Sequence, residues 1–192
     1  MNVRDVLEAY RQGRIDLQRA EQLLRLDFLE RVGQHTLFDH AREARRGIPE
    51  VIWGENKPPS MVAEIVSTAL RDRDAVLVSR ASPEHVGAII KVVDPRHVRY
   101  LEGCRLIVID RQPDRPMVGK IGILTAGSSD RAVAEEAKAM AEVMGCEVLT
   151  AYDIGVAALH RFLDPLARML DQGVDALVVV AGMEGALPTV VS

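Results

Sequence analysis

A chain of 192 residues, of which 48% are hydrophobic, can bury a substantial core in one large domain or two small ones. Its formal net charge of −4 and its aromatic content of 4% argue against a general nucleic-acid binder. The first residues lack the apolar core of a signal peptide and no run approaches the length of a membrane span, so we expect a cytoplasmic protein without a membrane partner. Cys104 and Cys146 have neither metal-site nor redox-motif spacing, which fits a reducing compartment better than a disulfide framework.

The chain opens with a pattern that predicts a helical hairpin. Apolar residues at helical spacing indicate a first helix that ends at Gly13, and Asp16 can cap a second helix. The apolar positions are Val6, Leu7 and Tyr10 in the first helix and Leu17, Ala20, Leu23 and Leu24 in the second. Two helices this short are marginal alone, so we expect them to need a neighbouring domain or subunit.

The next segment brings charged residues around a short predicted strand. An amphipathic helix is predicted over about 31–46, a strand over 50–53 and a helix over about 60–71. Arg42, Glu50 and Lys57 are candidates for contact with an anionic ligand. The alternative is a solvated charged face, because isolated surface charges usually contribute little to binding or stability.

Strands and helices then alternate up to a polar linker. Apolar runs predict strands at 75–79, 98–101 and 106–109, with a helix at 83–92 after the first of them. The sequence DRQPDRP, residues 110–116, is the candidate linker. We therefore predict an N-terminal helical plus α/β region over 1–112 and a second domain over 117–192.

In the second domain, predicted strands and helices alternate in the order that is typical of a parallel α/β sheet with helices on both faces. Its predicted elements are a strand at 118–124, a helix at 131–144, a strand at 147–151, a helix that begins near Asp164 and Pro165, and a strand at 176–181. We expect Val133, Ala137, Met140 and Met144 on the inner face of the first helix and full burial of the last strand. Three strands are few for a doubly wound sheet, so we expect this sheet to be incomplete on its C-terminal side.

Three loops, at 125–130, 152–161 and 182–188, should gather at the carboxyl ends of these strands, where an open α/β sheet binds its ligand. The first loop can hold a phosphate through Gly127, Ser128 and Ser129, while Asp130 can reach a ribose hydroxyl. The alternative for this loop is simple helix capping by Ser129 or Asp130.

The other two loops offer groups for proton transfer and for charge pairing. His160 can transfer protons near neutral pH, and Asp153 and Arg161 can pair with polar or anionic groups of a substrate. Glu184 lies between Gly182 and Gly185, where little side-chain bulk would keep a substrate away, and it suits a general base or a cation stabiliser. The alternatives are a structural histidine and an exposed turn glutamate.

The motifs GKIGILTAGSSD, YDIGVAALHR and ALVVVAGMEGALPTVVS, in this order, resemble the PurE-like domain of the LarB family. The upstream stretch DHAREARRGIPEVIWGENK resembles the N-terminal region of that family, so the likeness covers essentially the whole chain. It implies a PurE-like, flavodoxin/Rossmann-like parallel sheet. The purine-pathway carboxylase PurE is the nearest alternative, but its third loop typically reads AGGAAHLP, with histidine at the position of Ala186 and alanine at that of Glu184.

The resemblance also implies a reaction, in the biosynthesis of the nickel-pincer nucleotide. LarB enzymes carboxylate the pyridinium ring of nicotinic acid adenine dinucleotide at C5 and hydrolyse its phosphoanhydride, giving pyridinium-3,5-biscarboxylic acid mononucleotide and AMP. The electron-poor ring does not attack CO2, so in this family a cysteine thiolate first adds at C6 and makes C5 nucleophilic. No tightly bound cofactor is implied, Mg²⁺ assistance of the anhydride step stays open, and relatives with PurE-like domains form homo-oligomers.

The resemblance assigns roles residue by residue. Gly127, Ser128, Ser129 and Asp130 would hold phosphate and ribose, and Glu184 would lie beside the pyridinium ring. His160 and Arg161, with Asp153, occupy the loop that purine enzymes devote to substrate, and Gly182 and Gly185 give the substrate room. Arg42, Glu50 and Lys57 would contact the dinucleotide or the other domain.

One departure from the family pattern concerns the nucleophile. The cysteine of the family lies in a later motif, and neither Cys104 nor Cys146 occupies an equivalent place. We therefore expect residues 1–192 alone to have incomplete catalytic machinery. The alternatives to a LarB-type enzyme are a PurE-type aminoimidazole ribonucleotide carboxylase or mutase and a nucleotide-binding module without catalysis.

Overall fold

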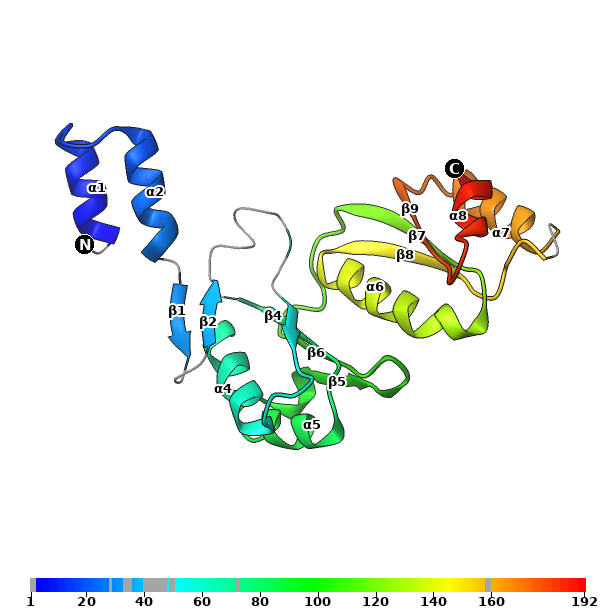
Figure 1. The fold of residues 1–192 in the computed structure, drawn as a ribbon, viewed down its shortest axis with the longest axis horizontal. Helices are drawn as coiled ribbons and strands as arrows, with labels where there is room; N and C mark the ends of the chain where they lie inside the picture. Colours follow the sequence, from blue (N-terminus) through cyan, green and yellow to red (C-terminus); the bar gives the residue numbers. More distant parts are fainter. Residues whose placement is uncertain are drawn as a thin grey trace.

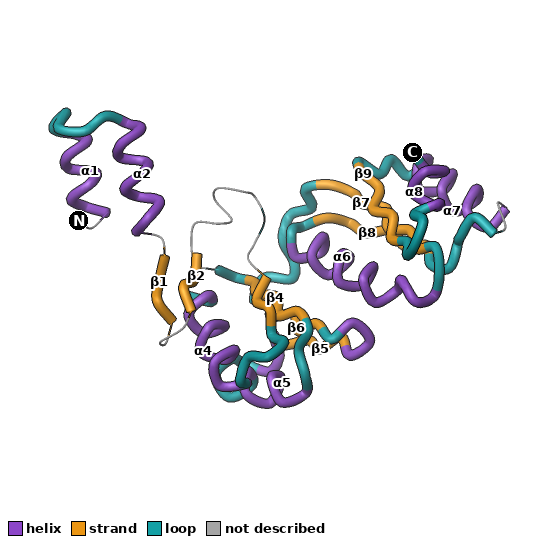
Figure 2. Tube along the Cα trace, viewed as in Figure 1, coloured by secondary structure: helices purple, strands orange, loops and turns teal. Residues whose placement is uncertain are grey.

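The computed structural model describes residues 3–27, 29–32, 36–39, 48, 51–71, 73–157 and 160–192. Within these ranges the chain forms a helical hairpin, a two-stranded sheet, a four-stranded sheet and a three-stranded sheet, in that order (Figure 1). The four-stranded and three-stranded sheets lie on either side of helix α6 (Arg131–Val143), as Figure 2 also shows. The α/β fold class predicted from the sequence is confirmed.

The N-terminal hairpin consists of α1 (Val3–Arg11) and α2 (Leu17–Asp27). The Arg19 backbone N–H donates to Asp16 Oδ1 at 2.7 Å, so Asp16 caps α2 as predicted. The buried contacts come from Val6, Ala9 and Ala20, whereas Leu7 and Tyr10 are about half exposed at 51% and 44%. The hairpin is therefore confirmed, although Leu7 and Tyr10 of its apolar positions are largely exposed.

The helix predicted over 31–46 was wrong in its first part. Strands β1 (Leu29–Val32) and β2 (Thr36–Asp39) pair in antiparallel register, with Leu29 opposite Asp39 and Val32 opposite Thr36. The antiparallel backbone pairing of these two segments takes the place of the predicted helix. The remaining positions of that prediction, 40–46, lie outside the described residues.

The four-stranded sheet has the order β3-β4-β6-β5 and is mixed, because only β3 and β4 run parallel. Its strands are β3 (Val51–Trp53), β4 (Ala75–Ser79), β5 (Val98–Leu101) and β6 (Leu106–Asp110). Two short 3₁₀ turns, η1 (Pro95–His97) and η2 (Glu102–Cys104), flank β5. The strands predicted at 75–79 and 98–101 are confirmed at both ends.

Both faces of this sheet are covered, which explains the continuous apolar runs of β4 and β6. Helices α4 (Pro59–Ala69) and α5 (Pro83–Ile89) pack on one face, against side chains that include Val78 and Ile107. The alternate residues Leu77 and Leu106 point to the other face, where they join an apolar cluster with α6. These strands therefore lack the alternation of apolar and polar residues that a half-buried strand shows.

The three-stranded sheet has the order β8-β7-β9 and is parallel throughout. Its strands are β7 (Gly119–Thr125), β8 (Cys146–Ala151) and β9 (Ala176–Val180). Helix α6 covers one face, and α7 (His160–Asp171) and α8 (Ala186–Val191) cover the other (Figure 2). A third 3₁₀ turn, η3 (Ser128–Asp130), leads from the first loop into α6.

Three details of this domain differ from the sequence predictions. Val133 is 53% exposed and Met144 36% exposed, because α6 lies between two sheets and buries small residues such as Ala134 and Ala139 instead. Helix α7 begins at His160, and Pro165 lies inside it. Strand β9 is partly exposed, with Val178 at 37%, because it forms one edge of the sheet.

The predicted linker is held by side-chain contacts at the junction of the two sheets. Arg115 Nη2 donates to Asp110 Oδ1 at 2.6 Å, and its Nη1 donates to the Val143 carbonyl at the end of α6. Both side chains of the ion pair are less than one-fifth exposed. The division at 112 and 117 stays a prediction, and the segment between the sheets is anchored to α6.

In the part of the chain that the structure describes, no helix has the length and apolarity of a membrane span.

The glycine at 122 lets α7 approach the centre of the three-stranded sheet. A Cβ at this position would lie 2.5 Å from Leu177 Cδ2 and 2.9 Å from Met169 Sδ. We expect Gly122→Ala to lower the free energy of unfolding by about 1 kcal/mol, because the ends of the Leu177 and Met169 side chains must shift. Urea denaturation measures this change.

The matched control is Gly87→Ala in α5, where a Cβ would have no atom within 4 Å. Because alanine favours a helix over glycine, we expect this variant to be as stable as the parent or slightly more stable. Equal stabilities of the two variants would contradict the packing role of Gly122.

Candidate functional site

The three loops predicted to converge do meet at the carboxyl edge of the three-stranded sheet. Thr125, fully buried at the end of the central strand β7, joins the first loop to the second. Its carbonyl accepts the Ile154 N–H at 2.9 Å and its Oγ1 accepts the Asp153 N–H at 2.9 Å. The next residue, Ala126, donates its N–H to the Val180 carbonyl at 2.9 Å. The first loop is thus hydrogen-bonded to the second loop and to the end of β9.

The first loop makes a tight cap ahead of α6. The Gly127 N–H donates to Asp130 Oδ2 at 2.9 Å and so closes the 3₁₀ turn η3, whereas the Asp130 side chain accepts no backbone N–H of α6. Ser128 and Ser129 form the turn between them and are exposed. Their hydroxyls remain accessible to a ligand at the start of α6.

The second loop packs closely on the first. A Cβ at Gly155 would lie 2.7 Å from the Ala126 carbonyl oxygen, so a glycine is needed for this approach of two backbones. Asp153 has a positive φ of 57° and faces Arg161 with Nη1 to Oδ2 at 3.9 Å. This ion pair is more than half exposed on both sides and contributes little to stability. His160 and Arg161 belong to the first turn of α7 and are exposed, while residues 158–159 lie outside the described ranges.

A tyrosine that the sequence analysis did not single out lies between the second loop and α6. The Tyr152 hydroxyl donates to Glu135 Oε1 at 2.9 Å, and the Arg131 guanidinium lies 5.0 Å from the ring centroid. Burial, helped by the hydrogen bond to Glu135 and opposed by one from Thr150, raises the pKa of Tyr152. The sequence signal for this part of the site is the pair Arg131 and Glu135. They are four residues apart at the start of a helix and therefore lie on one face of it.

The third loop presents its carboxylate on a backbone of unusual conformation. Glu184 has φ 61° and Gly185 has φ 59°, so two successive residues are left-handed. For a non-glycine residue this conformation costs about 1 kcal/mol, and such residues cluster at functional sites. The Glu184 side chain is exposed, and within the described residues it makes no hydrogen bond or ion pair. It is available to a ligand.

The candidates from the N-terminal region are not placed at this edge. Arg42 and Glu50 lie outside the described residues. Lys57 follows β3, and its Nζ donates to the Trp53 carbonyl at 2.6 Å. The Lys57 carbonyl accepts from His85 Nε2 at 3.0 Å, so this loop is tied to α5.

The two cysteines are poorly placed for nucleophilic attack at the loops. Cys104 is 5% exposed, its Sγ donates to the Leu101 carbonyl at 3.5 Å, and burial, with a smaller contribution from the charge of Glu136, raises its pKa. Cys146 begins β8 and therefore lies at the opposite edge of the sheet from the loops. Across the described ranges, no group of three or more His, Cys, Asp or Glu residues gathers as a metal site would require.

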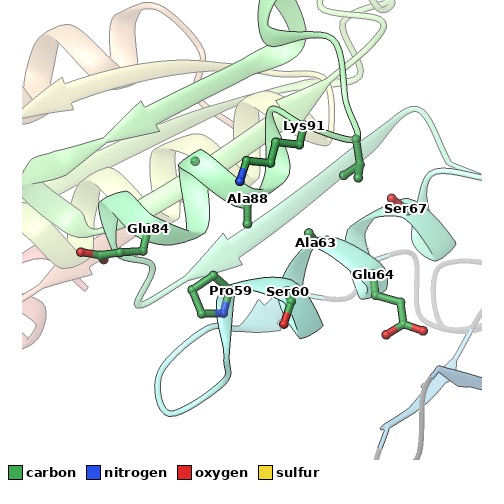
Figure 3. A pocket seen from close by; sticks show the side chains of 10 residues that line it. Pro59, Ser60, Ala63, Glu64, Ser67, Glu84, Ala88 and Lys91 are labelled. Carbon is green, nitrogen blue, oxygen red and sulfur yellow. The ribbon is translucent and has the colours of Figure 1, made fainter.

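A large groove lies away from the loops. It has a volume of about 840 Å³ and runs between α4 and α5, with Ala63 and Ala88 in its floor and Glu64, Glu84 and Lys91 around it (Figure 3). These helices cover the face of the four-stranded sheet that points away from α6. The groove is therefore separate from the convergence of the three loops.

Comparisons with known proteins agree with this architecture. Residues 29–112 match the family model described as the LarB/PurE-like N-terminal domain. The chain is also 36% identical over 200 residues to the uncharacterized protein MJ0165 of Methanocaldococcus jannaschii. That alignment covers 100% of this chain and 76% of the relative.

Proposed function

Because this chain belongs to the LarB/PurE-like family, we propose that it takes part in carboxylation of the pyridinium ring of nicotinic acid adenine dinucleotide at C5, coupled to hydrolysis of the phosphoanhydride. The family supports a carboxylase- or mutase-like role. The observation that carries the specific proposal is the meeting of three loops at one sheet edge, where exposed serine hydroxyls and the unpartnered Glu184 carboxylate are both accessible.

The proposed roles follow from charge. Nicotinic acid adenine dinucleotide has anionic phosphates and a positively charged pyridinium ring. The site likewise offers hydrogen-bond donors and a positive charge at one end and a carboxylate at the other. Ser128 and Ser129, at the start of α6, offer donors to a phosphate, and Arg161 adds a positive charge at the second loop. Glu184 offers a negative charge to the pyridinium ring and is the candidate acceptor for the C5 proton.

The reaction requires an electron pair at C5. A thiolate adds to C6, the resulting enamine attacks CO2 at C5, and loss of the C5 proton followed by departure of the thiolate restores the aromatic ring. Neither Cys104 nor Cys146 meets this requirement, because the first is buried with a raised pKa and the second lies at the wrong edge. We therefore expect residues 1–192 by themselves to bind the dinucleotide more readily than they turn it over.

A calorimetric panel tests the proposal with three ligands. Nicotinic acid adenine dinucleotide should bind more tightly than aminoimidazole ribonucleotide. AMP should bind with intermediate or weak affinity, because it offers only the phosphate and nucleoside. Selective binding of aminoimidazole ribonucleotide would overturn the pyridine proposal in favour of a PurE-type activity, and binding of AMP alone would favour a nucleotide-binding module.

The role of Glu184 is tested by removing its charge. Glu184→Gln should weaken binding of the dinucleotide, whose pyridinium ring carries a positive charge, by about 1.4- to fivefold, because an exposed ion pair contributes about 0.2–1 kcal/mol. The reduced form of the same dinucleotide, whose dihydropyridine ring has no positive charge on nitrogen, is the matched ligand, and its affinity should not change. An equal loss for both redox forms would show that Glu184 does not face the ring.

A further inference from the structure

A second cavity opens where the first loop meets the N-terminal region. Its volume is about 570 Å³, which falls in the range of small-molecule sites. One wall comes from the first loop and α6, and the other from the turn η2 after β5. The residues that line it include Ser128, Ser129, Arg131 and Glu135 on one side and Leu101 and Gly103 on the other.

The packing between the two sheets creates this cavity. Leu101 and Ala132 pack against the apolar cluster that joins α6 to the four-stranded sheet, so they give the cavity an apolar floor. Cys104, which also lines it, holds the turn by its hydrogen bond to the Leu101 carbonyl. The polar groups are all at the α6 side. The cavity thus has one apolar side and one side of hydroxyl and charged groups.

This chemistry fits a nucleoside attached to a phosphate. Ser128 and Ser129 line the cavity and also belong to the loop that is proposed to hold a phosphate. A ligand with its phosphate on these serines has room to extend toward η2. There the apolar floor suits the face of a base, and Glu135 can accept hydrogen bonds from ribose hydroxyls or an amino group.

We propose that this cavity is the subsite for the adenylate half of the dinucleotide, with the N-terminal region forming one of its walls. The proposal rests on the proposed function and deepens it. It gives a physical reason for selection of a dinucleotide, since a mononucleotide such as aminoimidazole ribonucleotide ends at its phosphate and leaves the cavity unfilled. The N-terminal region then contributes directly to substrate specificity.

Filling the cavity from the η2 side tests the subsite. Gly103 has no positive φ, and a Cβ there would have no atom within 4 Å, so Gly103→Leu adds a side chain to open space. We expect a loss of about tenfold or more in affinity for nicotinic acid adenine dinucleotide and for AMP. Affinity for nicotinic acid mononucleotide, which lacks the adenylate half, should stay the same.

Gly87→Leu is the matched control, because Gly87 also has open space at its Cβ but lines the groove between α4 and α5. It should leave all three affinities unchanged. If wild-type protein binds the dinucleotide and Gly103→Leu binds it equally well, the subsite is wrong while the proposed function stands. If wild-type protein binds none of these ligands, the proposed function itself fails.

A measurement on wild-type protein covers the case in which Gly103→Leu does not fold. AMP should protect the amides of Gly103, Cys104 and Ser129 from hydrogen exchange. Protection by AMP that excludes Gly103 and Cys104 would overturn the subsite.

Discussion

Thr125→Val is expected to detach the second loop from the end of β7 and to lower the free energy of unfolding by about 1–3 kcal/mol. Thr125 is fully buried, and its Oγ1 accepts the Asp153 N–H at 2.9 Å. Valine has nearly the same shape but no acceptor, so the Asp153 N–H loses its partner. Urea denaturation gives the change in stability, and calorimetry should show weaker dinucleotide binding because the loop is less well positioned.

The control for this variant is Thr125→Ser, which keeps the hydroxyl and removes a methyl group. Serine should retain the hydrogen bond and the position of the loop, with a smaller loss of stability from the missing methyl group. If valine supports full stability and full binding, Thr125 does not organise the site.

Gly155→Ala is expected to separate the first two loops and to weaken dinucleotide binding by about tenfold or more. The new Cβ would lie 2.7 Å from the Ala126 carbonyl oxygen. The backbones of the first and second loops cannot shift as easily as the end of a flexible side chain. Relief of this clash requires the second loop to move, which disturbs the hydrogen bond from Ile154 N–H to the Thr125 carbonyl. We expect a loss of about 1–3 kcal/mol in stability, measured by urea denaturation.

Gly182→Ala in the third loop provides the stability control. A Cβ at Gly182 would have no atom within 4 Å and its φ is not positive, so alanine should fit without strain. A loss of stability at Gly182 equal to that at Gly155 would mean that loop glycines matter for a general reason and not for the contact with Ala126.

Much of the fold follows from the sequence because most elements are short and clearly bounded. The runs AVLVS and VRYL are strands with the predicted ends, and Gly13 and Asp16 mark the helix boundaries that their residue types indicate. The parallel strands of the second domain also place the three loops together, since strand ends at one edge of a sheet are neighbours by topology.

The errors arise where packing outweighs a local signal. The Asp164 and Pro165 pair is typical of a helix start, yet α7 begins a turn earlier because Phe162, 4% exposed, packs in the same apolar cluster as Met169. The inner face of α6 was mispredicted because alanines, not the larger Val133, face the two sheets.

The parts of the site that the sequence did not reveal depend on contacts between distant segments. Tyr152 reaches Glu135 across the edge of the sheet, and the cavity beside Ser128 exists only because η2 packs against α6. No periodicity within one element encodes these contacts. Glu184, in contrast, was singled out from its glycine neighbours; its backbone is left-handed, and its role in the site stays a prediction.

Hydrogen exchange in the presence of nicotinic acid adenine dinucleotide tests the location of the site most directly. We predict protection of amides in 126–130, 152–156 and 182–185, and of those at 103–104 beside the proposed adenylate subsite, with the surrounding sheet unchanged. Protection confined to the groove between α4 and α5, or no protection at saturating ligand, would contradict it.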